Sequence, residues 1–312
     1  ECEYNEDIIV ESKIEKTDEF LKCGSFKIPI DSVNSKEDTF NMSAATTSMN
    51  LMRVIRAMQV NKPILLEGSP GVGKTSLVQA LADASGKTLT RINLSEQTDL
   101  IDLFGSDTPG ENTGEFVWRD APFLRAMQQG EWVLLDEMNL ASQSVLEGLN
   151  ACLDHRGEAY IPELDKAFTK KEGFLVFAAQ NPQFQGGGRK GLPKSFVNRF
   201  SVVYADSLTS DDLNKIAQHL YPNINPDIVE KMINLMSQLE NNVSVQKKFG
   251  SLGSPWEFNL RDTLRWLSLL NKGSIVGELK VQDFLNVIVR QRFRSDKDKE
   301  FIDELIKSVF GS

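Results

Sequence analysis

One segment of eight residues constrains the fold of this chain more than any other. Residues 68–75 match the phosphate-binding pattern G-x-x-x-x-G-K-[ST] at every fixed position. The mainly apolar residues 63–67 predict a short buried strand before the segment, and residues 76–82 predict a helix after it. A glycine-rich turn between strand and helix directs backbone N–H groups and the positive end of the helix toward an anion. The sequence therefore predicts an α/β domain that binds a nucleotide through its phosphates.

The residues of this loop have separate expected roles. Lys74 is expected to reach the β- and γ-phosphates of the nucleotide, and the Thr75 hydroxyl is an expected Mg²⁺ ligand. The other residues expected to bind the nucleotide surround these two in the chain, and they are Gly68, Ser69, Pro70, Gly71, Val72, Gly73 and Ser76.

The alternation of apolar runs and helical patterns extends the prediction to a whole domain. Strands are expected at residues 63–67, 88–94, 132–137, 174–180 and 200–205, with helices near 74–84, 120–129 and 142–154. Continuous apolar runs are typical of parallel strands buried on both faces. The pattern predicts a parallel sheet between helices over residues 45–206, with a hairpin insertion at about 157–174.

The two ends of the chain differ from this middle part. Residues 1–44 predict a linker with one short strand at about 23–30. Residues 207–312 predict a smaller all-helical domain, with a capping box at 209–212 and a helix opened by Asn225-Pro226. A third helix is expected between a cap at Asn259 and a stop at Gly273, and residues 281–292 and 299–309 predict one or two more.

Charge and cysteine content exclude several classes of protein. The formal net charge of −9 argues against a broad nucleic-acid-binding surface. Three cysteines without C-x-x-C spacing and two histidines make a zinc site or a disulfide framework unexpected, which favours a reducing compartment. Because the chain begins at Glu1 and not at Met, we expect it to be part of a longer protein.

Polar residues at the strand ends predict chemistry beyond binding. The third strand ends in Asp136-Glu137, where Asp136 is expected to hold Mg²⁺ through water and Glu137 to polarise the attacking water. Asn181 follows the fourth strand and is expected to hydrogen-bond the γ-phosphate or that water. Arg199 precedes the fifth strand, where a surface charge or a local ion pair is the simple interpretation.

Longer strings of residues resemble a known family. They lie at 94–100, 114–124, 136–141, 149–158, 180–182 and 186–193. Together they resemble the AAA+ ATPases, in the branch with a helix-2 insertion (here about 98–131) that includes MoxR and the dynein-related proteins. The resemblance covers roughly residues 45–272 and is strongest to the giant ring ATPases of ribosome assembly, which carry six such modules in one chain.

The resemblance implies further roles for arginines. Arg199 stands where the family places the arginine finger that reaches the nucleotide of the neighbouring module, and Arg261 stands at the second sensor of the lid. Arg265 is the alternative sensor, and an N-terminal helix position with Asp262 as an exposed partner is the alternative role of Arg261. Arg156 and Arg189 are weaker candidates for the inter-module interface.

The resemblance also implies an ATPase that uses ATP/ADP and Mg²⁺ in a ring of modules, which remodels the precursor of the large ribosomal subunit with its assembly factors in the nucleolus and nucleoplasm. Membrane or direct sequence-specific nucleic-acid binding is not expected.

The main alternative is a ring module that binds nucleotide without turning it over. A nucleotide kinase is disfavoured by the Asp136-Glu137 pair, and a GTPase by the missing Asp in the N-K-x-D-like segments 61–64 and 271–274.

Overall fold

The computed structural model describes residues 14–31, 44–69, 72–112, 114–154, 156–181, 191–252, 258, 260–276 and 281–311. The chain divides into two compact units. The core unit comprises Glu1–Asp38, Ser48–Ser69 and Lys74–Ala205, and the helical unit comprises Thr39–Thr47, Pro70–Gly73 and Asp206–Ser312.

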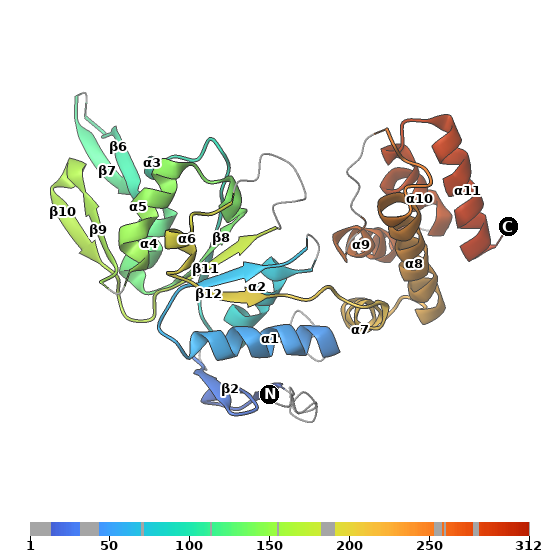
Figure 1. The fold of residues 1–312 in the computed structure, drawn as a ribbon, viewed down its shortest axis with the longest axis horizontal. Helices are drawn as coiled ribbons and strands as arrows, with labels where there is room; N and C mark the ends of the chain where they lie inside the picture. Colours follow the sequence, from blue (N-terminus) through green and yellow to red (C-terminus); the bar gives the residue numbers. More distant parts are fainter. Residues whose placement is uncertain are drawn as a thin grey trace. The chain divides into compact units, whose positions relative to one another are not determined.

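A five-stranded parallel sheet forms the centre of the core unit (Figure 1). Its order is β12 (Ser201–Tyr204), β4 (Ile64–Glu67), β11 (Leu175–Gln180), β8 (Trp132–Asp136) and β5 (Leu89–Asn93). The five predicted strands and the α/β fold are thereby confirmed. Because β11 lies between β4 and β8, the residues that follow these three strands are brought to one edge of the sheet.

Helices cover both faces of this sheet. Side chains of α4 (Pro122–Gln129) and α5 (Gln143–Leu153) share one apolar cluster with Leu65, Leu135 and Ala178 of the strands. The alternate strand residues face the other way, and α2 (Lys74–Ser85) packs against β8 and β11. Burial on both faces explains why the strands are continuous apolar runs in the sequence.

Two hairpins extend the core unit. Within residues 98–131, where the helix-2 insertion is expected, α3 (Leu100–Phe104) and α4 flank a hairpin of β6 (Gly105–Pro109) and β7 (Phe116–Asp120), which projects from the sheet (Figure 1). Asp120 anchors this hairpin, since it accepts hydrogen bonds from Trp118 Nε1 (2.8 Å) and Gln128 Nε2 of α4 (3.0 Å). The predicted second hairpin is confirmed as β9 (Glu158–Ile161) and β10 (Lys166–Thr169), joined through the 3₁₀ turn η3 (Pro162–Leu164).

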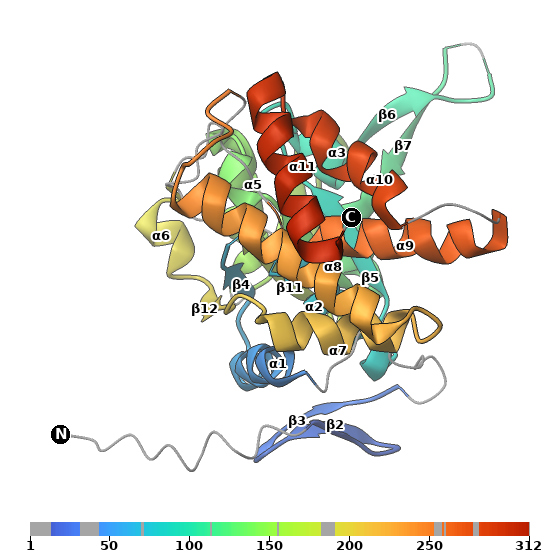
Figure 2. The same cartoon turned by 90° about the vertical axis from the view of Figure 1, so that its right-hand side faces the viewer.

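The N-terminal part holds more structure than the sequence suggested. In place of one short strand, β1 (Ile14–Lys16), β2 (Phe20–Cys23) and β3 (Phe26–Pro29) form an antiparallel sheet beside α1 (Ala45–Met58), as Figure 2 shows. Gly24, at φ +58°, makes the tight turn that divides the predicted strand into β2 and β3. Gln59 Nε2 donates to the Lys27 carbonyl at 3.0 Å, which ties this sheet to the end of α1.

The helical unit contains α7 (Ser210–Leu220), α8 (Pro226–Leu239), the π-helical η5 (Glu240–Val245), α9 (Leu260–Val276), α10 (Val281–Ile288), the short η6 (Arg290–Arg292) and α11 (Asp296–Phe310). The capping box at Thr209 and the start of α8 after Asn225 are confirmed. The predicted stop at Gly273 is wrong, because α9 continues to Val276, and the expected cap Asn259 lies outside the described residues. None of the helices within the described ranges is both long and apolar enough to cross a membrane.

Asp212 is a buried carboxylate that ties the starts of two helices together. It accepts hydrogen bonds from Thr209 N (2.9 Å) and Thr209 Oγ1 (2.7 Å) at the start of α7, and from Thr46 N (3.2 Å) at the start of α1. Burial alone raises the pKa of Asp212, but the hydrogen bonds from Thr46 and Thr209 outweigh it and lower the pKa below the ordinary value of 3.8.

We expect Asp212→Ala to lower the free energy of unfolding by about 1–2 kcal/mol at pH 7, the size of a lost N-cap. Because the folded-state pKa is depressed, this contribution is present above pH 3.8 and is lost as the pH falls through the lower folded-state pKa. Urea unfolding at pH 7 and pH 3 measures it, with the exposed neighbour Asp211→Asn as the control. An equal difference between wild type and Asp212→Ala at both pH values would contradict the capping role.

Candidate functional site

The polar side chains predicted from the sequence meet at the carboxyl edge of the sheet. Lys74 begins α2 after the loop that follows β4, Asp136 ends β8, and Asn181 follows β11 directly. The parallel register places these strand ends side by side, with Gln180 opposite Glu67. A continuous hydrogen-bond network joins Thr75, Asp136, Glu137, Asn181 and Lys74.

Lys74 is the buried cation of this network, and only 8% of its surface is exposed. Its Nζ donates to the carbonyl oxygens of Gly68 (2.7 Å) and Ser69 (3.1 Å) and to Asn181 Oδ1 (2.8 Å). These partners fix the ammonium group at the mouth of the loop. A desolvated ammonium held in this way is a strong anchor for phosphate oxygens.

Thr75 and Asp136 fit a Mg²⁺ ion. Thr75 Oγ1 donates to Asp136 Oδ2 at 2.9 Å. The Thr75 hydroxyl could therefore ligate a Mg²⁺ ion directly, and the Asp136 carboxylate beside it could accept a hydrogen bond from water bound to that ion. The described residues contain no cluster of three or more His, Cys, Asp or Glu side chains suited to a metal. A Mg²⁺ ion here would therefore rest on this pair, on water and on nucleotide phosphates, which is the usual arrangement for this ion.

Glu137 lies just outside its strand in a rare backbone conformation. The sequence suggested that β8 includes this residue, but the strand ends at Asp136 and Glu137 adopts φ +55° and ψ +43°. Glu137 N donates to Asp136 Oδ1 at 3.0 Å, which stabilises the turn. A left-handed non-glycine residue is costly and is found disproportionately at functional sites. The turn directs the Glu137 carboxylate to Asn181, whose Nδ2 donates to Glu137 Oε1 at 3.2 Å.

Asn181 connects the cation and the carboxylate of the site. Its side-chain oxygen accepts from Lys74 and its side-chain nitrogen donates to Glu137. A single amide thus fixes the distance between the group suited to hold the phosphates and the group suited to polarise water.

Two glycines of the loop have a structural requirement. A Cβ atom on Gly68 would lie 2.7 Å from the carbonyl oxygen of Ala205, so the loop packs against the end of β12 only without a side chain. Gly73 adopts φ +82°, which favours glycine. Ser69 and Ser76 are exposed beside the network, whereas Val72 is buried and Pro70 and Gly71 lie outside the described residues.

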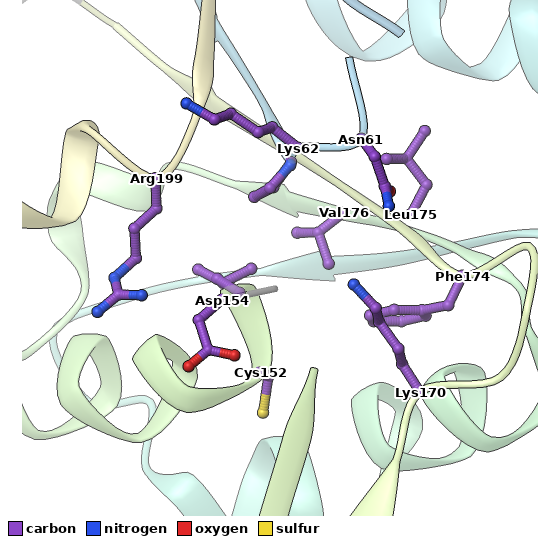
Figure 3. A pocket seen from close by; sticks show the side chains of 11 residues that line it. Asn61, Lys62, Cys152, Asp154, Lys170, Phe174, Leu175, Val176 and Arg199 are labelled. Atoms are coloured by element: carbon purple, nitrogen blue, oxygen red, sulfur yellow. The ribbon is translucent and has the colours of Figure 1, made fainter. Parts of the chain in front are cut away.

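Arg199 lies at the opposite edge of the sheet. It follows α6 (Lys194–Val197) and precedes β12, at the amino ends of the strands. It lines a pocket of about 290 Å³ with Asn61, Lys62, Asp154 and Lys170, among other residues (Figure 3). The buried Arg199 Nε has no hydrogen-bond partner among the described residues. Arg199 is therefore separate from the cluster around Lys74 in its own module.

The structure describes the other predicted arginines less completely than Arg199. Arg261 lies in the first turn of α9, but its side chain is outside the described part of the structure, and so is Arg189. Asp262 is not an exposed partner, because its side chain is 13% exposed and pairs with Arg292 Nη1 at 3.0 Å and more distantly with Arg265 Nη1 at 3.9 Å. The Arg156 backbone N–H donates to Asp154 Oδ1 at 2.8 Å.

Asn139 is a buried polar residue next to Asn181 that was not among the predicted site residues. This residue lies in the 3₁₀ turn η2 (Met138–Leu140) and is 3% exposed. Its Nδ2 donates to the carbonyl oxygen of Asn181 at 3.0 Å. The available signal was an amide residue two positions after the Asp-Glu pair, between the apolar residues Met138 and Leu140.

Two family models match the chain. The AAA domain of the dynein-related subfamily matches residues 63–200. The Midasin AAA lid domain matches residues 212–312.

Several known proteins are similar to the chain. Midasin from Dictyostelium discoideum is 53% identical over 289 residues, which are 91% of this chain and 5% of that protein. Midasin from Giardia intestinalis is 42% identical over 279 residues, or 88% of this chain and 6% of that protein. An uncharacterized protein from Staphylococcus haemolyticus is 30% identical over 210 residues, or 66% of this chain and 75% of that protein. The chain thus spans only about a twentieth of the length of the two midasins.

Proposed function

Because this chain belongs to the dynein-related AAA family, as an AAA module of the midasin type, we propose that it binds ATP with Mg²⁺ and hydrolyses it to ADP and phosphate. The observation that carries this proposal is the network in which Asn181 joins Lys74 to Glu137 while Thr75 contacts Asp136.

Each member of the network has a place in the proposed reaction. Lys74 binds the β- and γ-phosphates, and Thr75 and Asp136 hold Mg²⁺, which neutralises charge on the phosphate oxygens when it is bound. Glu137 polarises the water that attacks the γ-phosphate in line. Asn181 orients Glu137 and the terminal phosphate relative to each other, because its amide contacts the side chains on both sides. Arg261 is proposed to act as the second sensor from α9.

We further propose that the module works in a ring of AAA modules. Arg199, at the amino edge of the sheet, is proposed to serve the nucleotide of the neighbouring module. The similarity to midasin supports the proposal that such a ring remodels pre-60S ribosomal particles together with assembly factors, in the nucleolus and nucleoplasm. Nucleotide-driven movement of the lid would supply the work.

Lys74→Ala is expected to weaken ATP binding by at least about 30-fold, since truncating one partner of a buried, hydrogen-bonded charge costs about 2 kcal/mol or more. The substitution also leaves the oxygens of Gly68, Ser69 and Asn181 facing each other without their cation. Calorimetric titration of the chain with Mg·ATP measures the effect. Lys171→Ala, at an exposed position in the turn after β10, is the control.

Unchanged ATP affinity in Lys74→Ala would contradict the assignment of the loop. If the wild type binds ATP but neither the chain nor the assembled ring hydrolyses it at this site, the module has the alternative role of binding nucleotide without turnover. Measurement of bound nucleotide and of released phosphate in the same sample separates the two roles.

A further inference from the structure

Asn139 is the one buried side chain in η2 that is polar, and it contacts the backbone of Asn181 directly. Only 3% of its surface is exposed, and its Nδ2 donates to the Asn181 carbonyl oxygen at 3.0 Å. That carbonyl lies one residue beyond the last paired position of β11, which is Gln180 opposite Glu67. The hydrogen bond from Asn139 therefore holds the chain directly after the last residue of β11 that is paired in the sheet.

The orientation of the Asn139 amide follows from this contact. The opposite orientation would place its oxygen against the carbonyl oxygen of Asn181, so only Nδ2 can face it. Asn139 Oδ1 is then buried without a hydrogen-bond partner among the described residues. A buried acceptor without a partner is costly, so Asn139 gains from only one of its two polar groups, the Nδ2 that donates to Asn181. The one hydrogen bond that the Asn139 side chain makes among the described residues is thus directed at the backbone of Asn181.

The left-handed turn at Glu137 explains how Asn139 reaches this position. The chain reverses at Glu137, and η2 then packs against β11. Glu137 and Asn139 consequently approach the same residue from two sides: the Glu137 carboxylate accepts from the Asn181 side chain, and the Asn139 amide donates to the Asn181 backbone.

We propose that Asn139 is a positioning residue for Asn181 in the proposed ATPase reaction, on which this inference rests. Its hydrogen bond holds the Asn181 backbone after the end of β11, so that the side-chain amide presents its oxygen to Lys74 and its nitrogen to Glu137. Without this hydrogen bond, the side-chain amide of Asn181 rotates or moves away from Lys74 and Glu137. The γ-phosphate and the attacking water are then no longer held in a fixed position relative to each other. The first effect is on γ-phosphate recognition and turnover, and binding of the rest of the nucleotide is largely kept.

Asn139→Leu tests the proposal, because leucine keeps the volume of the side chain and removes the donor. We expect the affinity for ADP to change less than about 3-fold, whereas the preference for ATPγS over ADP and the single-turnover rate of ATP hydrolysis each fall roughly 5- to 10-fold, the size of one hydrogen bond. Asn181→Ala should show the same pattern. Asn150→Leu is the matched control, because Asn150 in α5 also has a buried Oδ1 without a partner in the described part of the chain.

The Asn139→Asp variant adds a measurement whose result would not change with pH if Asn139 had only a structural role. The ionised carboxylate repels the Asn181 carbonyl, whereas the protonated carboxyl donates to it. The ATPγS preference of Asn139→Asp, taken relative to wild type at each pH, should therefore recover as the pH falls from 8 to 5.5. This preference is measured by titration and needs no turnover.

The outcomes separate the inference from the proposed function. If Asn181→Ala loses the ATPγS preference but Asn139→Leu behaves like wild type, and Asn139→Asp shows no relative pH dependence, the positioning role is wrong and the ATPase proposal stands. If Asn181→Ala itself leaves the ATPγS preference and turnover unchanged, the role of Asn181 in the proposed function is wrong. A loss of ADP affinity in Asn139→Leu equal to the loss of ATPγS affinity would indicate a general disturbance of the site and would also overturn the inference.

Discussion

Replacing Arg199 by Ala is expected to lower ATP hydrolysis at the neighbouring module of the assembled ring by about 10³–10⁵-fold, the usual contribution of an arginine finger. This corresponds to roughly 4–7 kcal/mol of the activation barrier at 1.36 kcal/mol per tenfold change. The position of Arg199 explains the direction of the effect. Arg199 lies at the amino edge of the sheet, and the network of Lys74, Glu137 and Asn181 lies at the carboxyl edge. At about 3.3 Å per residue, the four-residue strands β4 and β12 span about 13 Å between these edges.

The chain by itself should therefore bind ATP and hydrolyse it slowly, because in the proposed ring the arginine finger for its site would come from another module. Phosphate release per site, compared between the chain alone and the assembled ring, measures the contribution in trans. Arg125→Ala, at an exposed position of α4, is the control for removal of a surface arginine. Equal rates for a monomeric chain and for the ring would show that no arginine from a neighbour is required.

Glu137→Gln is expected to lower hydrolysis by about 10²–10⁴-fold while ATP affinity stays within a few-fold of wild type. The amide has the shape of the carboxylate and its oxygen still accepts the hydrogen bond from Asn181 Nδ2, so the network around Lys74 and Asn181 is preserved. What is lost is the basicity that polarises water, and general-base catalysis contributes a factor of this size. Single-turnover hydrolysis and ATP titration on the same preparation measure both quantities.

The matched control is Glu131→Gln, which removes a carboxylate just before the same strand. Glu131 Oε2 accepts from Thr90 Oγ1 at 3.2 Å, at the amino end of β8 and away from the network at its carboxyl end. Hydrolysis at the wild-type rate in Glu137→Gln would remove Glu137 from the mechanism. A large loss of ATP affinity in that variant would indicate that the carboxylate supports the loop and does not act on water.

Much of the core unit could be predicted because its signals are local. A strand buried on both faces must be apolar along its whole length, so β4, β8 and β11 are visible as runs that end in polar residues. The capping box at Thr209 and the proline that opens α8 are likewise local, because the groups that satisfy the helix N-terminus are neighbours in the chain.

The failures occur where a local signal is outweighed by packing or by a single backbone angle. Gly273 does not stop α9, since one glycine lowers helix stability by only about 1 kcal/mol. The N-terminal segment was expected to hold one strand, but the positive φ at Gly24 turns it into a hairpin whose Leu21, Cys23 and Ile28 are buried. This segment has too few apolar residues for the sequence to indicate a sheet. The sheet is stabilised only when these residues are buried against the rest of the folded protein.

The sequence by itself determined the type of fold and the identity of the residues at the phosphate loop and the strand ends, because these depend on spacing along the chain. Only the tertiary structure decided how those residues meet. It brought Asn181 between Lys74 and Glu137, placed Thr75 at 2.9 Å from Asp136, and put Arg199 at the far edge of the sheet. It also showed Asn139 behind Asn181. The physical reason is that hydrogen bonds between strand ends depend on strand order, register and the turn at Glu137, which are set by burial of the whole sheet.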